Sequence, residues 1–260
     1  MAKRYRPLAA IVLLLFLLAG CTPKQSAEDA LEIGAALESP LPAAAAEVPG
    51  AVPPAQANAA NTKAQNGTVS IVDAVAVHFP GVLYGAVAYR NDGSAPVALS
   101  AATFIFRYAG GSQTSDFTPI AANSDIVMPG ETAYCTLWLP YDDARGVPEN
   151  LAVEAELTAQ GVTQSAQQLT VGDARLIQNY PGFATLSGSL KNPGVKNCDL
   201  NVVYAGMYDE NGKLLAVWYF TRNAVLQPGE DTAFVVHLQA LPLEGLAERT
   251  KEIRLRAFGI

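Results

Sequence analysis

The histidines, the cysteines and one pair of adjacent carboxylates are the residues of this chain that could carry out acid–base, nucleophilic or metal chemistry, and their spacing fits none of these reactions. There are two histidines, His78 and His237, and neither has a neighbour at the H-x-x-x-H or C-x-x-C spacing that holds a metal ion. Asp142 and Asp143 form a carboxylate pair that could serve acid–base work or Ca²⁺. Calcium, however, takes about six to eight oxygens at a recognisable spacing. We therefore predict a solvated loop at this pair.

The short motifs that position a nucleophile or a phosphate are also absent. The sequence contains no G-x-S-x-G or S-x-x-K motif and no glycine-rich phosphate loop. We predict that the protein is not an enzyme and has no catalytic residues, no metal and no cofactor.

The three cysteines are Cys21, Cys135 and Cys198, too few for a disulfide framework. Cys135 and Cys198 fall in different halves of the folded region, so a bridge would require strands of two domains to meet. The simpler interpretation is two buried free thiols, a common state of cysteine.

The beginning of the chain has the order of a bacterial export signal. Basic residues at positions 3, 4 and 6 precede an apolar run over residues 8–18. That run is shorter than the ~20 apolar residues that a membrane-spanning helix needs. A removable signal is therefore favoured over a permanent N-terminal membrane anchor.

The run ends in Leu18-Ala19-Gly20-Cys21, which resembles the lipobox of bacterial lipoproteins. The resemblance implies that Leu18, Ala19 and Gly20 are recognised by the signal peptidase, which removes residues 1–20. Cys21 would then carry diacylglycerol as the first mature residue, and two acyl chains anchor a protein stably. We expect a protein on the extracytoplasmic face of the cell membrane or outer membrane. An ordinary secretory signal cut near Ala19 is the alternative.

The chain is acidic, with 17 Lys and Arg against 24 Asp and Glu and a net charge of −7. Loss of residues 1–20 would remove three basic residues and no acidic one, leaving a net charge of −10. Because an acidic surface repels phosphate backbones, nucleic acid is not an expected partner.

Alanine and proline dominate residues 22–66, which contain no aromatic residue. Such a composition buries too little apolar surface to offset the entropy of ordering. We predict that residues 21–66 are the lipidated cysteine and a disordered linker that extends the folded part away from the membrane.

From residue 67, short alternating runs rich in Val, Tyr, Phe and Thr predict strands and hairpins. The pattern recurs at an offset of 99 to 103 residues. The repeated features are Asp73 and Asp173, Phe79-Pro80-Gly81 and Tyr180-Pro181-Gly182, Gly85 and Gly188, Asn91 and Asn192, Tyr108 and Tyr208, and Pro129-Gly130-Glu131 and Pro228-Gly229-Glu230. Repetition at this length indicates two tandem domains, residues 67–168 and 169–260. We interpret the two aspartates as turn residues that precede a first strand.

Each repeat is predicted to hold about seven short strands, as in an antiparallel sandwich. A strand over residues 200–208 leads into Asp209-Glu210-Asn211-Gly212, where Asn-Gly favours a type I′ hairpin turn. A helical pattern is confined to residues 243–249. The predicted fold class is all-β, with two tandem immunoglobulin-like antiparallel β-sandwiches.

The second repeat contains LSGSLKNPG, VVYAGMYDENGKLLA and LQPGEDTAFVV. This pattern resembles an FxLYD-type domain, an immunoglobulin-like sandwich of bacterial envelope lipoproteins. Met207-Tyr208-Asp209 matches the end of the name-giving motif, whereas Ala205 replaces its Phe. The first repeat matches more loosely. The resemblance covers roughly residues 67–260 and implies the fold, because such modules share no active site.

Trp138 and Tyr141 flank Pro140 near a strand end, where they could form an exposed aromatic binding surface. Core packing is the alternative for Trp138 and the favoured role for Trp218. We expect a membrane-anchored, non-enzymatic lipoprotein whose paired domains bind another envelope protein or act as a spacer, with contacts at domain edges that include strand addition. The alternative is a cell-wall glycan-binding or enzyme-accessory lipoprotein that uses Trp138 and Tyr141.

Overall fold

The computed structural model describes residues 64–65, 68–119, 125–163, 167–180, 183–238, 243 and 245–260. Outside these residues lie the predicted signal peptide, most of the predicted linker, and Cys21 with Leu18, Ala19 and Gly20 of the predicted lipobox. Across the described ranges, no helix combines the length and hydropathy of a membrane span.

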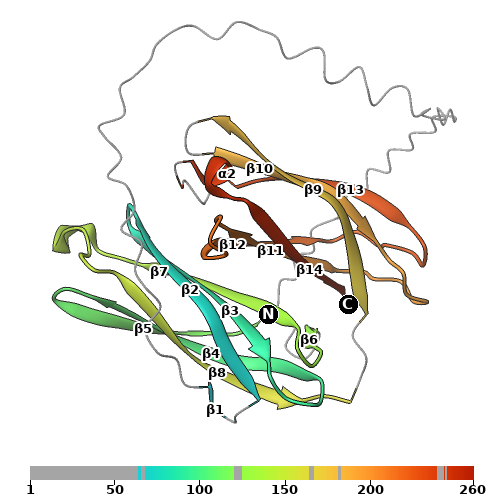
Figure 1. Cartoon of the computed structure of the whole chain (residues 1–260), viewed down its shortest axis with the longest axis horizontal. Helices are drawn as coiled ribbons and strands as arrows, with labels where there is room; N and C mark the ends of the chain where they lie inside the picture. The colour runs from blue at the N-terminus through green and yellow to red at the C-terminus, as the bar shows by residue number, and fades with distance from the viewer. Residues whose placement is uncertain are drawn as a thin grey trace, which may run out of the picture. The chain divides into compact units, whose positions relative to one another are not determined.

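The first sandwich consists of two sheets (Figure 1). Its strands are β1 (Ala64–Gln65), β2 (Val69–Phe79), β3 (Val82–Asn91), β4 (Val97–Tyr108), β5 (Gly111–Phe117), β6 (Ile126–Val127), β7 (Thr132–Pro140) and β8 (Ala152–Gly161). One sheet has the order β2-β3-β7 and the other β1-β8-β4-β5, with β6 also on β4. The 3₁₀ helix η1 (Asp143–Arg145) lies between β7 and β8. β1 pairs in parallel with β8, so residues that we assigned to the linker contribute a strand.

The second sandwich repeats this plan. Its elements are β9 (Gln168–Tyr180), β10 (Phe183–Lys191), β11 (Asn201–Tyr208), β12 (Leu214–Arg222), β13 (Asp231–His237), α2 (Leu246–Arg249) and β14 (Glu252–Gly259). The strand order is β12-β11-β14-β9-β10-β13, where the start of β9 joins two halves that otherwise correspond to the two sheets of the first sandwich. The all-β, antiparallel sandwich fold is therefore confirmed.

A buried asparagine explains part of the sequence repeat. In each copy its side-chain amide donates to two carbonyl groups, and its oxygen accepts from a backbone N–H, over 2.8–2.9 Å. These bonds join Asn91 to Ala95 O, Val127 O and Gly93 N, and Asn192 to Lys196 O, Leu226 O and Gly194 N. Both side chains are fully buried, so in each sandwich one amide ties the loop that follows it to a second, distant stretch of backbone.

The Pro-Gly-Glu turn bonds to the backbone of the same asparagine. The N–H of Asn91 donates to Glu131 O over 3.0 Å, and Gly130 N donates back to Asn91 O over 2.8 Å. The second copy makes the same pair of bonds with Glu230 and Gly229. Each turn glycine has a positive φ, +80° and +78°, which a side chain would strain. The repeated residues thus close one recurring turn.

When the two repeats are aligned on Asn91 and Asn192, one pair of equivalent residues differs from the pair predicted from sequence. The strand registers align Gly85 with Leu186, and not with Gly188 as we predicted from sequence. Gly188 lies opposite Phe234, where a Cβ would stand 2.7 Å from the ring. The two glycines are therefore not equivalent.

Asp73 and Asp173 lie inside β2 and β9, each at a β-bulge, so the prediction of turns before the first strand was wrong. Asp173 has a φ of 51°. The Asp73 carboxylate accepts the N–H of Ala74 over 2.8 Å. A bulge takes backbone groups out of the ladder, and a short acidic side chain can accept from them.

The β11–β12 hairpin forms where predicted, with a different turn. Gly212 N donates to Asp209 O over 3.0 Å, and within this turn only Gly212 has a positive φ, 72°. A type I′ turn requires positive φ at both central residues, so this is a type I turn followed by a glycine bulge. The register shift between Met207 and Tyr208 is a second irregularity, which leaves Leu215 of β12 without an opposite residue.

The central strands are buried on both faces because the two sandwiches share an apolar cluster. β11 is buried at every residue, and β3 at every residue except Val82 and Arg90. One face of the sheet β2-β3-β7 contributes to the core of the first sandwich. Its other face belongs to the core cluster of the second sandwich and provides Val75, Val77, Tyr84, Ala86, Ala88 and Tyr134. One continuous cluster therefore joins the two repeats.

Candidate interaction site

Strand β12 is the last strand of its sheet, and side chains of the first sandwich cover the first half of its outer edge. The Tyr84 hydroxyl donates to Val217 O over 2.5 Å and accepts from Val217 N over 2.8 Å. The Asp73 carboxylate accepts from Leu214 N over 2.6 Å. Burial raises the pKa of Tyr84 well above its usual value, so the hydroxyl keeps its proton and can act as the donor. These bonds satisfy edge groups that would otherwise be buried without partners.

An ionic cluster also joins the two sandwiches. Arg256 of β14 donates from Nε to Asp125 over 2.6 Å and from Nη1 to Glu131 over 3.0 Å, and Nη2 donates to Ile126 O. The side chains of Arg256 and Asp125 are only 10% and 14% exposed. Burial raises the pKa of Asp125 despite its cationic partner. Burial also acts to raise the pKa of Glu131, but hydrogen bonds from Met128 N and Arg256 outweigh it and hold that pKa low.

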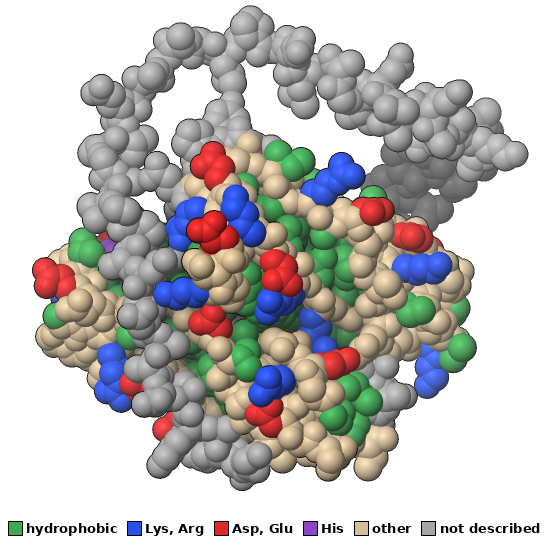
Figure 2. Space-filling model, in the orientation of Figure 1, with side chains coloured by type: hydrophobic (Ala, Val, Ile, Leu, Met, Phe, Trp, Pro, Cys, Tyr) green, Lys and Arg blue, Asp and Glu red, His purple; other side chains and the backbone are tan. Residues whose placement is uncertain are grey.

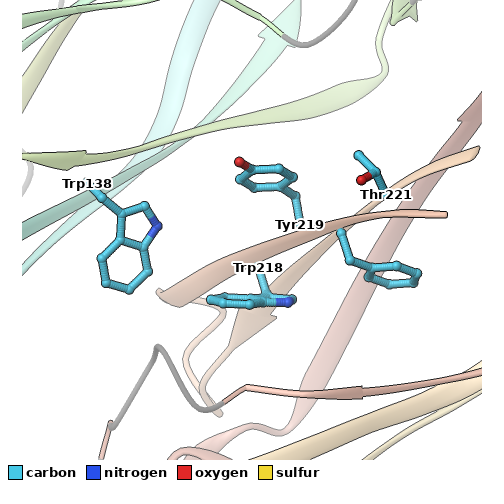
Figure 3. Close-up of a pocket in the computed structure, with 5 residues that line it drawn as sticks. Trp138, Trp218, Tyr219 and Thr221 are labelled. Carbon is cyan, nitrogen blue, oxygen red and sulfur yellow. The ribbon is translucent and has the colours of Figure 1, made fainter. Parts of the chain in front are cut away.

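Beyond the covered half of the edge lies an open groove of about 430 Å³, which we call the aromatic groove. It is lined by Trp138, Trp218, Tyr219, Phe220 and Thr221. The rings of Trp138 and Trp218 meet edge to face with centroids 6.4 Å apart (Figure 3). Trp138 also packs on Phe79 (5.8 Å) and Tyr84 (4.8 Å). The groove thus begins where the contact between the sandwiches ends.

The expected exposed surface of Trp138 and Tyr141 does not form, because Tyr141 is buried at 7% exposure. Its hydroxyl donates to Gly146 O over 3.0 Å, and its ring meets His78 and Tyr108 edge to face. This loop closes on itself after Pro140, which turns Tyr141 inward. Trp138 is half-buried, and its partner across the groove is Trp218.

The residues singled out for possible chemistry take part in structural contacts. His78 Nε2 lies 2.9 Å from Asp143 Oδ1, and the other carboxylate oxygen accepts from Gly81 N over 2.7 Å. Asp142 caps η1 by accepting from Ala144 N. His237 Nδ1 contacts Thr185 Oγ1 over 3.0 Å.

Cys135 and Cys198 are buried free thiols, as the simpler interpretation predicted. Burial raises the pKa of both thiols, which keeps them protonated and unreactive. Among the described residues, no group of three His, Cys, Asp or Glu side chains is arranged to hold a metal ion.

Charges are mixed on the face shown in Figure 2, where Lys and Arg stand among Asp and Glu instead of forming a basic patch. Several are paired, as in Arg107 with Glu154 over 2.7 Å and Arg254 with Glu252 over 2.7 Å. That nucleic acid is a poor partner stays a prediction from the acidic composition.

Comparison with known proteins identifies no family. No family model matches the chain, and no curated protein matches it. Among solved structures, red sea bream transglutaminase shares 11% identity and a TM-score of 0.20, over 66% of this chain and 27% of the other. Bacteroides uniformis beta-glucuronidase 2, bound covalently to cyclophellitol-6-carboxylate aziridine, shares 15% identity and a TM-score of 0.18, over 60% and 21%. This chain therefore spans about a quarter or less of either protein, and likenesses of this size define neither a family nor an activity.

Sequence reasoning missed the residues that join the repeats. Tyr84, Arg256 and Asp125 were not singled out, and Asp73 was assigned to a turn. One signal was available for Tyr84, because β3 and β7 carry aromatic residues at positions where β10 and β13 carry Thr185 and His237. A face that is aromatic in one repeat and polar in the other is covered in the first only.

Proposed function

We propose that this chain is a membrane-anchored, extracytoplasmic, non-enzymatic lipoprotein whose two immunoglobulin-like sandwiches form one rigid body that binds a partner protein of the cell envelope. Support for the anchor comes from the order of residues 1–21, which is typical of an export signal and ends in a sequence that resembles a lipobox. The resemblance to FxLYD-type domains fits the same setting.

The observation that carries the binding role is the aromatic groove at the end of the interface between the two sandwiches. Five side chains of the first sandwich bond to the second, beside a shared apolar cluster: Asp73, Tyr84, Asp125, Glu131 and Tyr134. A body fixed in this way loses little further freedom when a partner binds. The lining of four aromatic side chains is of the kind enriched at protein interfaces.

The anchor is tested by following radiolabelled fatty acid in cells that express the full chain. We expect label on the wild type and membrane fractionation of the protein. Cys21→Ala should lose both label and membrane association. Retention of both by Cys21→Ala would remove the anchor from the proposal.

The binding role is tested by crosslinking the anchored protein in intact cells with an amine-reactive crosslinker. We expect one defined envelope protein to be captured by the wild type. A clean negative, repeated with a carboxyl-reactive crosslinker, would leave only a spacer role.

Cell-wall glycan binding is a second candidate, because two tryptophans line one groove and sugars stack on aromatic faces. Retention of the full chain on peptidoglycan or polysaccharide columns tests it. This candidate requires that Trp138→Ala abolish retention. Unchanged retention would dismiss it.

A further inference from the structure

We propose that the aromatic groove takes an extended, uncharged peptide segment of a partner protein, which adds a strand to the outer edge of β12 at Tyr219 and Thr221. This inference rests on the proposed protein-binding function and names the site and the chemistry of its ligand.

The direction of the backbone groups follows from the contact with Tyr84. Both the N–H and the C=O of Val217 bond to the Tyr84 hydroxyl, so they face away from β11. Strand residues alternate with a period of two, and the β11–β12 ladder has no register shift between Val217 and Arg222. The backbone groups of Tyr219 and Thr221 therefore face outward along the same edge.

These outward groups have no partners in the described part of the chain. Among the described residues outside the strand ladder, none makes a hydrogen bond to the backbone N–H or C=O of Tyr219 or Thr221. An edge of this kind is a template for another strand unless Lys, Pro, a bulge or a covering element blocks it. Here the covering side chains stop at Val217, and the next outward positions are Tyr219 and Thr221.

The groove continues the established interface between the sandwiches. Asp73 and Tyr84 bond to the edge at Leu214 and Val217, and the groove opens directly beyond them. Two residues further along, a peptide backbone would make the same kind of contact that the Tyr84 hydroxyl makes. A strand of three residues spans roughly 10 Å, enough to pair with both Tyr219 and Thr221.

The lining specifies the chemistry of the added strand. None of the five lining residues is charged, so a charged side chain would be desolvated there without an ion partner. Trp138 and Trp218 offer apolar surface to alternate side chains of the strand. The indole N–H of Trp218 is buried and has no acceptor among the described residues.

The test uses the full chain in detergent and the synthetic peptide acetyl-Thr-Val-Thr-Val-Thr-amide, with tryptophan fluorescence as the binding signal. Thr221→Pro removes the outward N–H while leaving the bonds to β11, because proline is tolerated where the N–H of an edge strand faces solvent. Thr221→Val keeps the backbone donor and is the matched control. We expect roughly tenfold weaker binding for Thr221→Pro and binding within about twofold of the wild type for Thr221→Val.

A second comparison keeps the wild-type chain and changes the ligand. A peptide N-methylated at alternate residues has the same side chains but lacks the pairing donors, and we expect it to lose binding. Equal binding of the methylated peptide, equal binding by Thr221→Pro, or no binding of the parent peptide would each overturn strand addition. Displacement of the peptide by a chitin hexasaccharide whose binding needs Trp138 but tolerates Thr221→Pro would assign the groove to glycans.

Cellular crosslinking separates this inference from the proposed function. If the wild type and Thr221→Pro capture the same partner equally, the partner binds elsewhere on the body and only the inference fails. If neither chain captures a partner, the proposed binding function fails.

Discussion

At the scale of single residues, the buried asparagines show how one side chain can fix several loops at once. Asn192 bonds to the carbonyls of Lys196 and Leu226 and to the N–H of Gly194, and its side chain is fully buried. Neither carbonyl can turn to solvent without opening the sandwich. The repeated asparagine is thus explained by packing and hydrogen bonding and needs no functional role.

Replacement of Asn192 by alanine should destabilise the protein by about 3 kcal/mol, because buried carbonyl and N–H groups lose their partners. Urea denaturation of the full chain measures this change. The exposed Asn211 is the matched control, and Asn211→Ala should change the free energy of unfolding by less than about 0.5 kcal/mol. Equal effects of the two substitutions would contradict the structural role.

At the scale of elements, the outer edge of β12 is covered by a tyrosine from another strand. Tyr84→Phe keeps the ring beside Trp138 but leaves Val217 N and O without a partner. The expected loss of stability is about 2 kcal/mol in urea denaturation. Tyr108→Phe is the control, since the Tyr108 hydroxyl makes no hydrogen bond to the described residues, and it should stay within about 0.5 kcal/mol. If Tyr84→Phe leaves the free energy of unfolding unchanged, water reaches this edge and replaces the tyrosine hydroxyl.

The strands and turns show how much of this fold can be predicted from the sequence. Leu151, Val153, Ala155 and Leu157 are buried at alternate positions, a period of two that the sequence shows directly. The Asn-Gly signal placed a hairpin correctly and its turn type wrongly, since the glycine, and not the asparagine, has positive φ.

The candidate site was less predictable. The bond from Tyr84 to Val217 joins residues 133 positions apart and depends on how two sandwiches pack. No local period reports such a contact. For the same reason, Trp138 was recognised as a candidate, whereas its partner was taken to be Tyr141 instead of Trp218.

At the scale of the whole molecule, the ionic cluster at Arg256 gives the joint between the sandwiches a pH dependence. Arg256→Met leaves Asp125 buried without its cation, which should cost about 3–5 kcal/mol at pH 7. The pKa of Asp125 is already raised, so its ionised form opposes folding at neutral pH and protonation relieves it. The loss caused by the substitution should therefore shrink as the pH falls from about 7 to 4.

In the wild type, ionisation of Glu131 has the opposite effect on stability from ionisation of Asp125. The pKa of Glu131 is held below the usual value, so its ionised form stabilises the fold at neutral pH, and this contribution is lost as the pH falls through the lowered folded pKa. Urea denaturation at about pH 7 and pH 4 measures the net effect of the two carboxylates on the free energy of unfolding. Arg107→Met, which breaks an exposed pair with Glu154, should cost roughly 0.5 kcal/mol at either pH. A loss for Arg256→Met that grows on acidification would exclude Asp125 as its cause.

The shared apolar cluster predicts that the two sandwiches unfold together. Cys135 lies in the core of the first sandwich and Cys198 in that of the second, and burial protects both thiols. Pulses of N-ethylmaleimide along a urea series, read by mass spectrometry of the separate peptides, report the opening of each core. Because Arg256, Asp73 and Tyr84 tie the sandwiches together, the two labelling midpoints should coincide in the wild type. Arg256→Met should lower both midpoints, and if the joint is weakened enough it should separate them. Distinct midpoints in the wild type would mean that the repeats are independent domains, and the groove between them would then lack the rigid frame on which partner binding depends.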